Sequence, residues 1–451
     1  MGLGETMRVH RLRALSYSFI FATLIATACS SVAQQARAAQ HSTLDMTPVK
    51  PETVGFSSER LERLHALIQD EIDHKQLAGA VTILARHGKV VDYRTYGVRD
   101  ISTGAAMTKD TILRDYSMTK PVTGVAMMIL YEEGKWLPND PISKYIPEFA
   151  QLKVFNGVGA DGKMILVDPE HAPTMRELMS HSAGFSYGNG KTLVDAMYQD
   201  LKPMQSANLQ ETMDKLAKIP LNYPPGKGWM YSVSMDIEGY IVEKLSGQSL
   251  PDFMHDHIFT PLGMGDAGFF VPEDKRSRFA TNYKDDGHGQ LSVTAAGSPP
   301  NDYAKQPTMP SGGGGLVSTP EDYYRFAQML AHGGELDGKR VLAPATVRLM
   351  TSNHLPDELL TGKFGIGQHI MRPGFGYGYN CAVVFDPPAA NLPDGKGTFF
   401  WDGAAGTWFW VDPANDIVFV GMIQRMTSPD NHNLLYRSHA VVDQALVDAE
   451  K

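Results

Sequence analysis

Residues 114–128 read Arg-Asp-Tyr-Ser-Met-Thr-Lys-Pro-Val-Thr-Gly-Val-Ala-Met-Met, which places Ser117 three residues before Lys120. Side chains three apart share one face of a helix. The apolar run that follows is typical of a buried helix, and Pro121, which lacks an N–H, is tolerated only near a helix start. The stretch therefore predicts a helix beginning close to Ser117, with an amine one turn from a hydroxyl that it could deprotonate.

A second element lies more than a hundred residues later. Tyr231-Ser232-Val233 follows a Pro/Gly-rich turn at 224–228 and precedes an apolar helical run. A tyrosine at the tip of such a loop could reach the Ser–Lys pair and act as general base or proton shuttle. Both elements also have plainer interpretations: a serine N-cap followed by a solvated lysine, and a packed tyrosine with a satisfied hydroxyl.

The third element is Phe400-Trp-Asp-Gly-Ala-Ala-Gly-Thr407, at the end of a predicted strand. Small residues there let a substrate lie against the backbone, and an N–H can face a developing oxyanion. Taken alone, the same pattern could be a strand in which glycines mark a bulge.

The two ends of the chain carry the strand signals. Residues 80–93 predict two strands joined at 87–89, after an amphipathic helix opened by Ser57 and Ser58. Residues 407–411 and 417–423 predict two more, followed by a helix over about 434–447. Between the ends lie helical segments and Gly/Pro-rich loops. We therefore expect an α+β fold, with an antiparallel sheet built from both chain ends, flanked by helices, and a mostly helical inserted region.

In this order, the three elements resemble those of the serine β-lactamase and penicillin-binding-protein superfamily. The resemblance is to its class C-like branch, which includes the family VIII carboxylesterases, and it covers nearly the whole chain after the N-terminal segment. Residues 174–185, 258–264 and 314–322 resemble further segments of that family. The resemblance implies a β-lactamase/transpeptidase-like fold.

It also implies a role for each matching residue. Ser117 would be the acylated nucleophile, and Lys120, held neutral by its surroundings, would share the general-base role with Tyr231. The backbone N–H groups of Ser117 and Ala404 would form the oxyanion hole. Water would then release the acyl group, with no metal or organic cofactor.

Trp401-Asp402-Gly403 departs from the family pattern. This substrate-binding triplet occupies the place of Lys-Thr-Gly, whose cation and hydroxyl hold the substrate carboxylate in penicillin-recognising enzymes. An acid at Asp402 would oppose an anionic substrate if its side chain faces the pocket. Tyr231-Ser232-Val233 also lacks the asparagine of the Tyr-x-Asn motif.

Both departures favour a carboxylesterase acting on compact, neutral esters, small molecules that would be its partners. A class C-like β-lactamase or a D-Ala-type peptidase is the first alternative. An acyltransferase using the same residues is another, and a catalytically silent binding protein of this fold is an alternative of a different class.

Two other motifs carry less weight. Gly184-Phe-Ser186-Tyr-Gly188 matches the G-x-S-x-G nucleophile elbow, but a helical segment precedes it where that elbow needs a strand. We expect this loop to border the mouth of the site. The four glycines at 312–315 lack a following Gly-Lys-Ser/Thr, so we expect a close backbone approach rather than phosphate binding. No histidine or cysteine spacing indicates a metal site.

The N-terminus predicts export. Arg8, Arg11 and Arg13 precede an apolar stretch at 14–28, and Ala36-Arg-Ala38 fits a cleavage site. We expect residues 1–38 to be a secretory signal peptide and 39–451 one hydrolase domain, periplasmic or secreted. Lipidation at Cys29 is a minor alternative, and no other run is apolar enough to span a membrane. The net charge of −9, without a basic cluster, disfavours nucleic-acid binding.

Overall fold

The computed structural model describes residues 44–286, 288–294, 303–360, 373–426 and 429–448. The described residues from Met46 onward form one compact unit. The predicted signal peptide, its cleavage site and Cys29 lie outside the described residues, so these predictions and the single-domain boundary at residue 39 stay predictions.

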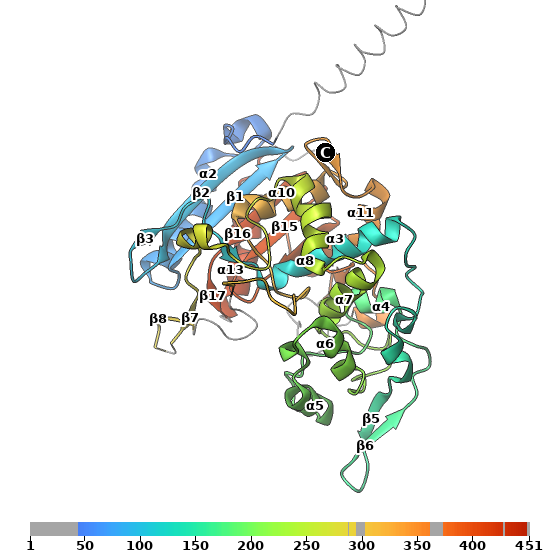
Figure 1. Ribbon diagram of the computed structural model, residues 1–451. Coiled ribbons are helices and arrows are strands. Elements are labelled where there is room, and N and C mark those ends of the chain that lie inside the picture. Colours follow the sequence, from blue (N-terminus) through green and yellow to red (C-terminus); the bar gives the residue numbers. More distant parts are fainter. Residues whose placement is uncertain (1–43, 287, 295–302, 361–372, 427–428, 449–451) are drawn as a thin grey trace, which may run out of the picture. The chain divides into compact units, whose positions relative to one another are not determined.

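An eight-stranded antiparallel sheet forms the centre of this unit (Figure 1), in the order β12-β13-β14-β15-β16-β1-β2-β3. β1 pairs with β16 antiparallel, with Val81 opposite Met422. The first and last parts of the chain therefore meet at the middle of the sheet, as predicted. The strands are β1 (Gly79–Arg86), β2 (Lys89–Asp100), β3 (Ala105–Ala106), β12 (Phe375–Tyr377), β13 (Ala382–Val384), β14 (Thr398–Asp402), β15 (Trp408–Asp412) and β16 (Ile417–Met422).

Local sequence sets both central hairpins. His87 and Gly88 join β1 to β2 with φ values of 54° and 68°, the left-handed pair that a two-residue hairpin turn needs. In the turn from β15 to β16, the Asp412 carboxylate accepts hydrogen bonds from the backbone N–H groups of Ala414 and Asn415, at 2.9 and 3.1 Å.

Helices cover both faces of the sheet. α10 (Pro320–Ala331) packs against β15, β16 and β1, whereas α13 (Pro429–Asp443) packs against α2 (Ser58–Asp73). Successive residues of β15 point to opposite faces: the ring of Phe409 lies 5.1 Å from that of Tyr323 on α10, and the Trp408 indole donates to Ser438 on α13 at 3.1 Å.

The last helix ends earlier than the predicted residue 447. Beyond Asp443 the chain leaves the helix to pair with its own beginning, and the Val447 N–H donates to the Gly55 carbonyl at 2.9 Å. The first helix begins as predicted, because the Ser57 hydroxyl caps it by accepting from the Arg60 N–H.

The inserted region between β3 and β12 is mostly helical, as expected. Its central helix, α3, is buried along almost its whole length and packs against α7, α8 and α11. Besides α10, the α-helices of this region are α3 (Thr119–Glu132), α4 (Met175–Met179), α5 (Leu193–Leu201), α6 (Leu209–Leu216), α7 (Ser234–Ser246), α8 (Leu250–Met254), α9 (Thr260–Leu262) and α11 (Pro344–Met350), and α12 (Pro387–Ala390) lies between β13 and β14.

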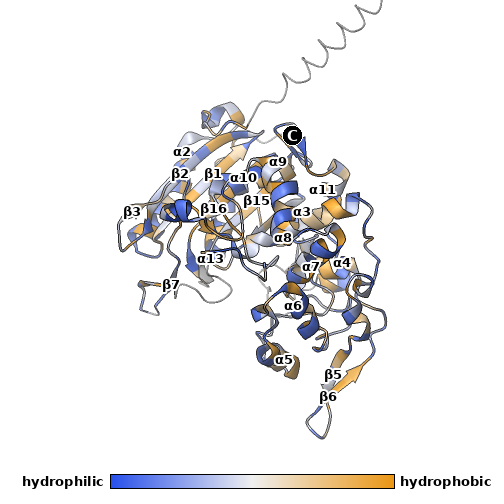
Figure 2. Ribbon diagram, viewed as in Figure 1, coloured by the Kyte–Doolittle hydropathy of each residue, from blue (hydrophilic) through white to orange (hydrophobic). Residues whose placement is uncertain are grey.

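Short strand pairs complete the fold. They are β4 (Leu113–Arg114) with β9 (Val317–Ser318), β10 (Glu335–Leu336) with β11 (Lys339–Arg340), β5 (Val154–Val158) with β6 (Met164–Val167), and β7 (Tyr283–Asp285) between β8 (Leu291–Val293) and β17 (Arg425–Met426). Figure 2 shows the apolar character of β6 in the projecting β5–β6 hairpin, which the sequence analysis did not predict. None of the described helices is both long and apolar enough to cross a bilayer.

Candidate active site

Ser117 lies in a tight turn that leads into α3. A single 3-10 turn, Tyr116–Met118, precedes the helix, and Tyr116 has a φ of 47°, a conformation that costs energy for a residue with a side chain. The Tyr116 hydroxyl accepts from the Asn282 amide at 3.0 Å. The bond to Asn282 therefore anchors the turn through the Tyr116 side chain, and Ser117 faces a pocket.

Lys120 is the second residue of α3, and its side chain is buried against that serine. Its Nζ lies 3.1 Å from Ser117 Oγ and donates to the Gly313 carbonyl at 2.6 Å. Burial lowers the pKa of Lys120 to about 7, although nearby carboxylates partly oppose the shift. A substantial share of this amine is therefore neutral near pH 7, and a neutral amine can accept the serine proton.

Tyr231 comes from the loop before α7 and completes the group. The Lys120 Nζ lies 4.4 Å from the centroid of its ring. The Ser117 hydroxyl lies within hydrogen-bonding reach and lowers the pKa of Tyr231, but burial outweighs this and raises the pKa well above its usual value. Tyr231 is thus a protonated phenol at neutral pH, suited to passing a proton while Lys120 holds the base position.

Aromatic side chains hold the Tyr231 ring in place. The ring centroids of His181, Tyr187 and Trp401 lie 4.9, 5.4 and 5.6 Å from it. His181 Nδ1 lies 3.0 Å from Ser232 Oγ, and burial lowers the pKa of His181 well below its usual value. Ser232, next to Tyr231, therefore fixes a neutral histidine behind the tyrosine.

The Trp401-Asp402-Gly403 triplet ends β14 and enters the turn beside Ser117. Trp401 is 1% exposed and packs edge-on against Tyr377, so its indole supports the wall behind Tyr231. Asp402 is partly exposed, and its charge raises the pKa of Lys120.

Gly403 must be a glycine at this position. A Cβ there would lie 2.2 Å from Thr407 Oγ1 and 2.3 Å from the Asp115 carbonyl. Both distances are far inside van der Waals contact, so the end of β14 can approach the nucleophile turn this closely only without a side chain.

The two predicted oxyanion donors are the backbone N–H groups of Ser117 and Ala404. Ser117 is the middle residue of the nucleophile turn Tyr116–Met118, and Ala404 directly follows Gly403 in a turn and is itself exposed. Within the described part of the chain, neither backbone N–H donates to another protein group. The two groups are thus available to an external acceptor, and their joint role stays a prediction.

A pocket of about 460 Å³ opens above Ser117 and Tyr231. Its described lining is largely apolar or aromatic and contains no lysine or arginine. Gly313, Gly314 and Gly315 form one wall, which explains the predicted close backbone approach. The other lining residues are Tyr116, Tyr187, Asn189, Met204, Asp236, Phe269, Tyr303, Pro307, Met309 and Ser311.

Ser186, the serine of the G-x-S-x-G match, is not placed as a nucleophile. It follows helix α4, is 1% exposed, and accepts a hydrogen bond from the Gly188 N–H at 2.9 Å. Its own hydroxyl donates to Asp195 at 3.3 Å. Its neighbours Tyr187 and Asn189 do line the pocket, so this loop borders the site as predicted.

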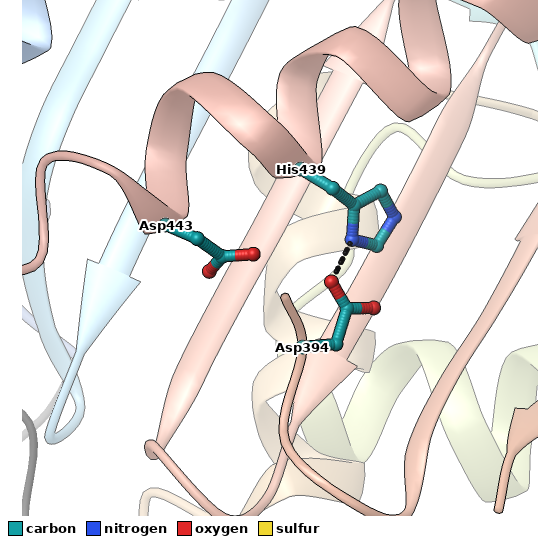
Figure 3. Close-up of side chains that lie close together, drawn as sticks. All are labelled: Asp394, His439 and Asp443. Atoms are coloured by element: carbon teal, nitrogen blue, oxygen red, sulfur yellow. Dashed lines mark hydrogen bonds and ion pairs between the residues drawn. The ribbon is translucent and has the colours of Figure 1, made fainter. Parts of the chain in front are cut away.

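One cluster has the composition of a metal site. Asp394, His439 and Asp443 offer ligand atoms within 4.8 Å of one another, between α13 and the loop before β14 (Figure 3). However, His439 Nδ1 already bonds to Asp394 Oδ1 at 3.0 Å. The cluster shares no residue with the pocket lining around Ser117.

Asp236 is the site residue that the sequence analysis missed. It lies five residues after Tyr231 in the first turn of α7, is fully buried, and lines the pocket. The available signal was an acid inside an apolar helical run, because buried carboxylates need specific partners.

Several known proteins are similar to this chain over most of its length. Protein Rv1367c of Mycobacterium tuberculosis is 36% identical over 374 residues, which cover 81% of this chain and 90% of that protein. Esterase EstB of Burkholderia gladioli is 31% identical, covering 78% and 87%.

The solved structure of EstCE1, described as a hydrolase with promiscuous acyltransferase activity, superposes with a TM-score of 0.71 at 26% identity, over 86% of this chain and 98% of that one. The model of the family described as Beta-lactamase matches residues 64–444. The chain therefore belongs to the beta-lactamase family and has its β-lactamase/transpeptidase-like fold.

Proposed function

We propose that this protein is a serine carboxylesterase that hydrolyses compact, neutral esters through an acyl-enzyme on Ser117. The observation that carries the proposal is the contact of Ser117 Oγ with Lys120 Nζ at 3.1 Å, beside a pocket whose described lining contains no lysine or arginine. EstB, a relative over most of the chain, is named an esterase.

In the proposed reaction, neutral Lys120 takes the Ser117 proton as Oγ attacks the ester carbonyl carbon. The carbonyl oxygen becomes an oxyanion, which the N–H groups of Ser117 and Ala404 stabilise. Tyr231 passes the proton from Lys120 to the leaving alkoxide, and the C–O bond breaks. A water molecule then attacks the acyl-enzyme with the same groups in reverse order.

The pocket supports a neutral substrate over an anionic one. β-Lactams carry a carboxylate, which would need a cationic or hydroxyl partner where this chain has Trp401 and Asp402. Trp401 is buried against Tyr231, and Asp402 adds negative charge beside Lys120. Like-charge repulsion would weaken binding of such a substrate.

Export also remains part of the proposal. The basic and apolar pattern of residues 1–38 supports a cleaved secretory signal. Mass spectrometry of protein expressed from the full-length chain should find a new N-terminus at residue 39. A diacylglyceryl group on Cys29 would instead establish lipidation.

The deciding experiment compares hydrolysis of p-nitrophenyl butyrate and nitrocefin, with Ser117→Ala and Ser186→Ala as matched serine variants. We expect ester turnover far above nitrocefin turnover, a loss of at least ~10⁴-fold in Ser117→Ala, and little change in Ser186→Ala. Efficient nitrocefin turnover would make the protein a β-lactamase. Equal loss in a folded Ser186→Ala would overturn the assignment of Ser117.

The same samples separate the remaining alternatives. An added alcohol acceptor that diverts most product from acid to ester would identify an acyltransferase. A protein that neither turns over esters nor reacts with a fluorophosphonate would be a catalytically silent binding protein.

A further inference from the structure

Asp236 is linked to Lys120 through the glycine loop at residues 312–315. Its Oδ1 accepts hydrogen bonds from the Ser311 hydroxyl at 2.6 Å and from the Gly313 N–H at 3.1 Å. The Gly313 carbonyl in turn accepts from Lys120 Nζ at 2.6 Å. One carboxylate thus holds the residue whose carbonyl orients the proposed base.

We infer that Asp236 is a positioning residue that fixes Gly313 against Lys120 and supplies the negative charge that Lys120 meets on becoming protonated. The inference rests on the proposed serine-hydrolase function. It adds a residue outside the Ser117, Lys120 and Tyr231 set.

Packing around Gly313 leaves the loop little freedom. A Cβ on Gly313 would lie 2.8 Å from Asp236 Oδ2 and 3.0 Å from the Tyr187 hydroxyl. One turn after Lys120, on the same face of α3, Thr123 donates to the Gly312 carbonyl at 2.7 Å. Shifting the loop would therefore break several buried contacts, so its carbonyl stays aimed at Lys120.

Three carboxylates act on the Lys120 charge from the elements around it. Asp236 has the largest influence and Asp402 the next, followed by Glu238. Glu238 is held elsewhere, because its Oε2 accepts from the Asn380 amide at 2.6 Å. The other titratable groups facing Lys120 are the buried Tyr187 and Tyr231, whose rings lie under the amine, and His181, whose pKa Lys120 lowers.

The charge of Asp236 has two opposite consequences for the reaction. When Ser117 attacks, its proton moves to Lys120 Nζ and a positive charge forms there, which an Asp236 carboxylate stabilises. The same carboxylate favours the protonated amine in the resting enzyme, so a higher pH is needed before Lys120 can act as a base. Removing the charge should lower the maximal rate and widen the active pH range downward.

This pair of effects can be measured with Asp236→Asn, which retains an oxygen acceptor for Ser311 and Gly313 but loses the charge. The readouts are kcat for p-nitrophenyl butyrate and the rate of Ser117 phosphonylation by an uncharged fluorophosphonate, from pH 5 to 9. We expect the acid limb to move down by about one pH unit and the plateau to fall about 10-fold.

Asp322→Asn is the matched control. Asp322 is also a buried aspartate, but it caps α10 through the Thr319 N–H and is not among the carboxylates that act on Lys120. Its variant should leave the acid limb where it is. A purely structural role for Asp236 would lower the plateau in Asp236→Asn without moving the limb, and that result would overturn the inference.

Ser311→Ala serves if Asp236→Asn does not fold. Burial raises the pKa of Asp236, and the 2.6 Å bond from Ser311 opposes that shift. Removing the bond favours the neutral carboxyl, so the limb should move in the same direction by less. An unmoved limb in a folded Ser311→Ala would also overturn the inference. Failure of the proposed function gives a different result, because Ser117→Ala would then retain turnover and phosphonylation.

Discussion

Two buried groups of charged side chains in this molecule have similar composition but different surroundings. Each combines one basic nitrogen with two carboxylates. The first group lies beside the Ser117 pocket and consists of Lys120, Asp236 and Glu238. The second consists of His439 and Asp443 on α13 and Asp394 on the loop before β14 (Figure 3).

The basic nitrogens of the two groups have different neighbours. Lys120 Nζ contacts a serine hydroxyl that faces a pocket of about 460 Å³. His439 is 1% exposed, stacks on Trp410 with ring centroids 4.5 Å apart, and bonds to Asp394. Burial lowers the pKa of Lys120 and raises that of Asp443, but a perturbed residue can do chemistry only where a substrate reaches it. The comparison therefore supports the proposed catalytic role of the first group and a structural role for the second.

Removing the base should have the largest effect. Lys120→Met keeps the length of the side chain but cannot accept the Ser117 proton, so kcat/KM for p-nitrophenyl butyrate should fall at least ~10³-fold at pH 8. The exposed Lys153→Met, which loses only an ion pair to Asp168, should keep its activity. A folded Lys120→Met with near-normal turnover would place the base elsewhere.

Removing the proposed proton relay should cost less. Tyr231→Phe keeps the ring that packs against Trp401 but cannot pass a proton to the leaving group, so kcat should fall about 10²-fold while KM changes little. Tyr324→Phe is the control, because that buried hydroxyl has no hydrogen-bond partner among the described residues. A loss confined to KM in Tyr231→Phe would indicate substrate binding instead.

Local sequence signals predicted much of the fold and part of the site. The hairpin at His87 and Gly88 and the helix after Ser57 follow from short-range rules of turn and cap formation. The spacing of Ser117 and Lys120 placed their side chains together because both lie within one helical turn. In each case the contacts involve residues close in the sequence.

The missed features depend on contacts between distant segments. The partners of Asp236 are Ser311 and Gly313, which lie more than seventy residues further along the chain. No local sequence pattern predicts that contact. The surroundings of Trp401 also depend on distant segments, because Tyr231 and Tyr377 pack against its ring from other parts of the chain. Its predicted contact with substrate stays a prediction. Propensity and spacing predict elements; only packing decides which faces remain open.

The prediction with the smallest expected effect on activity concerns the second group. Burial, Asp394 and Asp412 raise the pKa of Asp443 to about 9, whereas in the unfolded chain the group titrates near its ordinary value of 3.8. Between these values the folded state binds a proton that the unfolded state lacks, so wild-type stability falls as pH rises from about 4 to about 9.

Asp443→Asn is neutral at every pH and removes this dependence. Its free energy of unfolding relative to wild type should therefore increase by up to about 4 kcal/mol between pH 5 and pH 8, as measured by urea denaturation, with hydrolysis of p-nitrophenyl butyrate unchanged. The exposed Asp168→Asn should show no such trend.

Zinc binding by the second group would contradict this prediction most directly. If purified wild-type protein holds stoichiometric zinc, and EDTA lowers its Tm while leaving Asp443→Asn unaffected, then the carboxylates of the second group bind a cation instead of sharing a proton. The loss of ligand would then make Asp443→Asn less stable than wild type at every pH, because bound metal stabilises the folded state. Burial alone would no longer account for the difference between the two groups, and the second would be a metal centre.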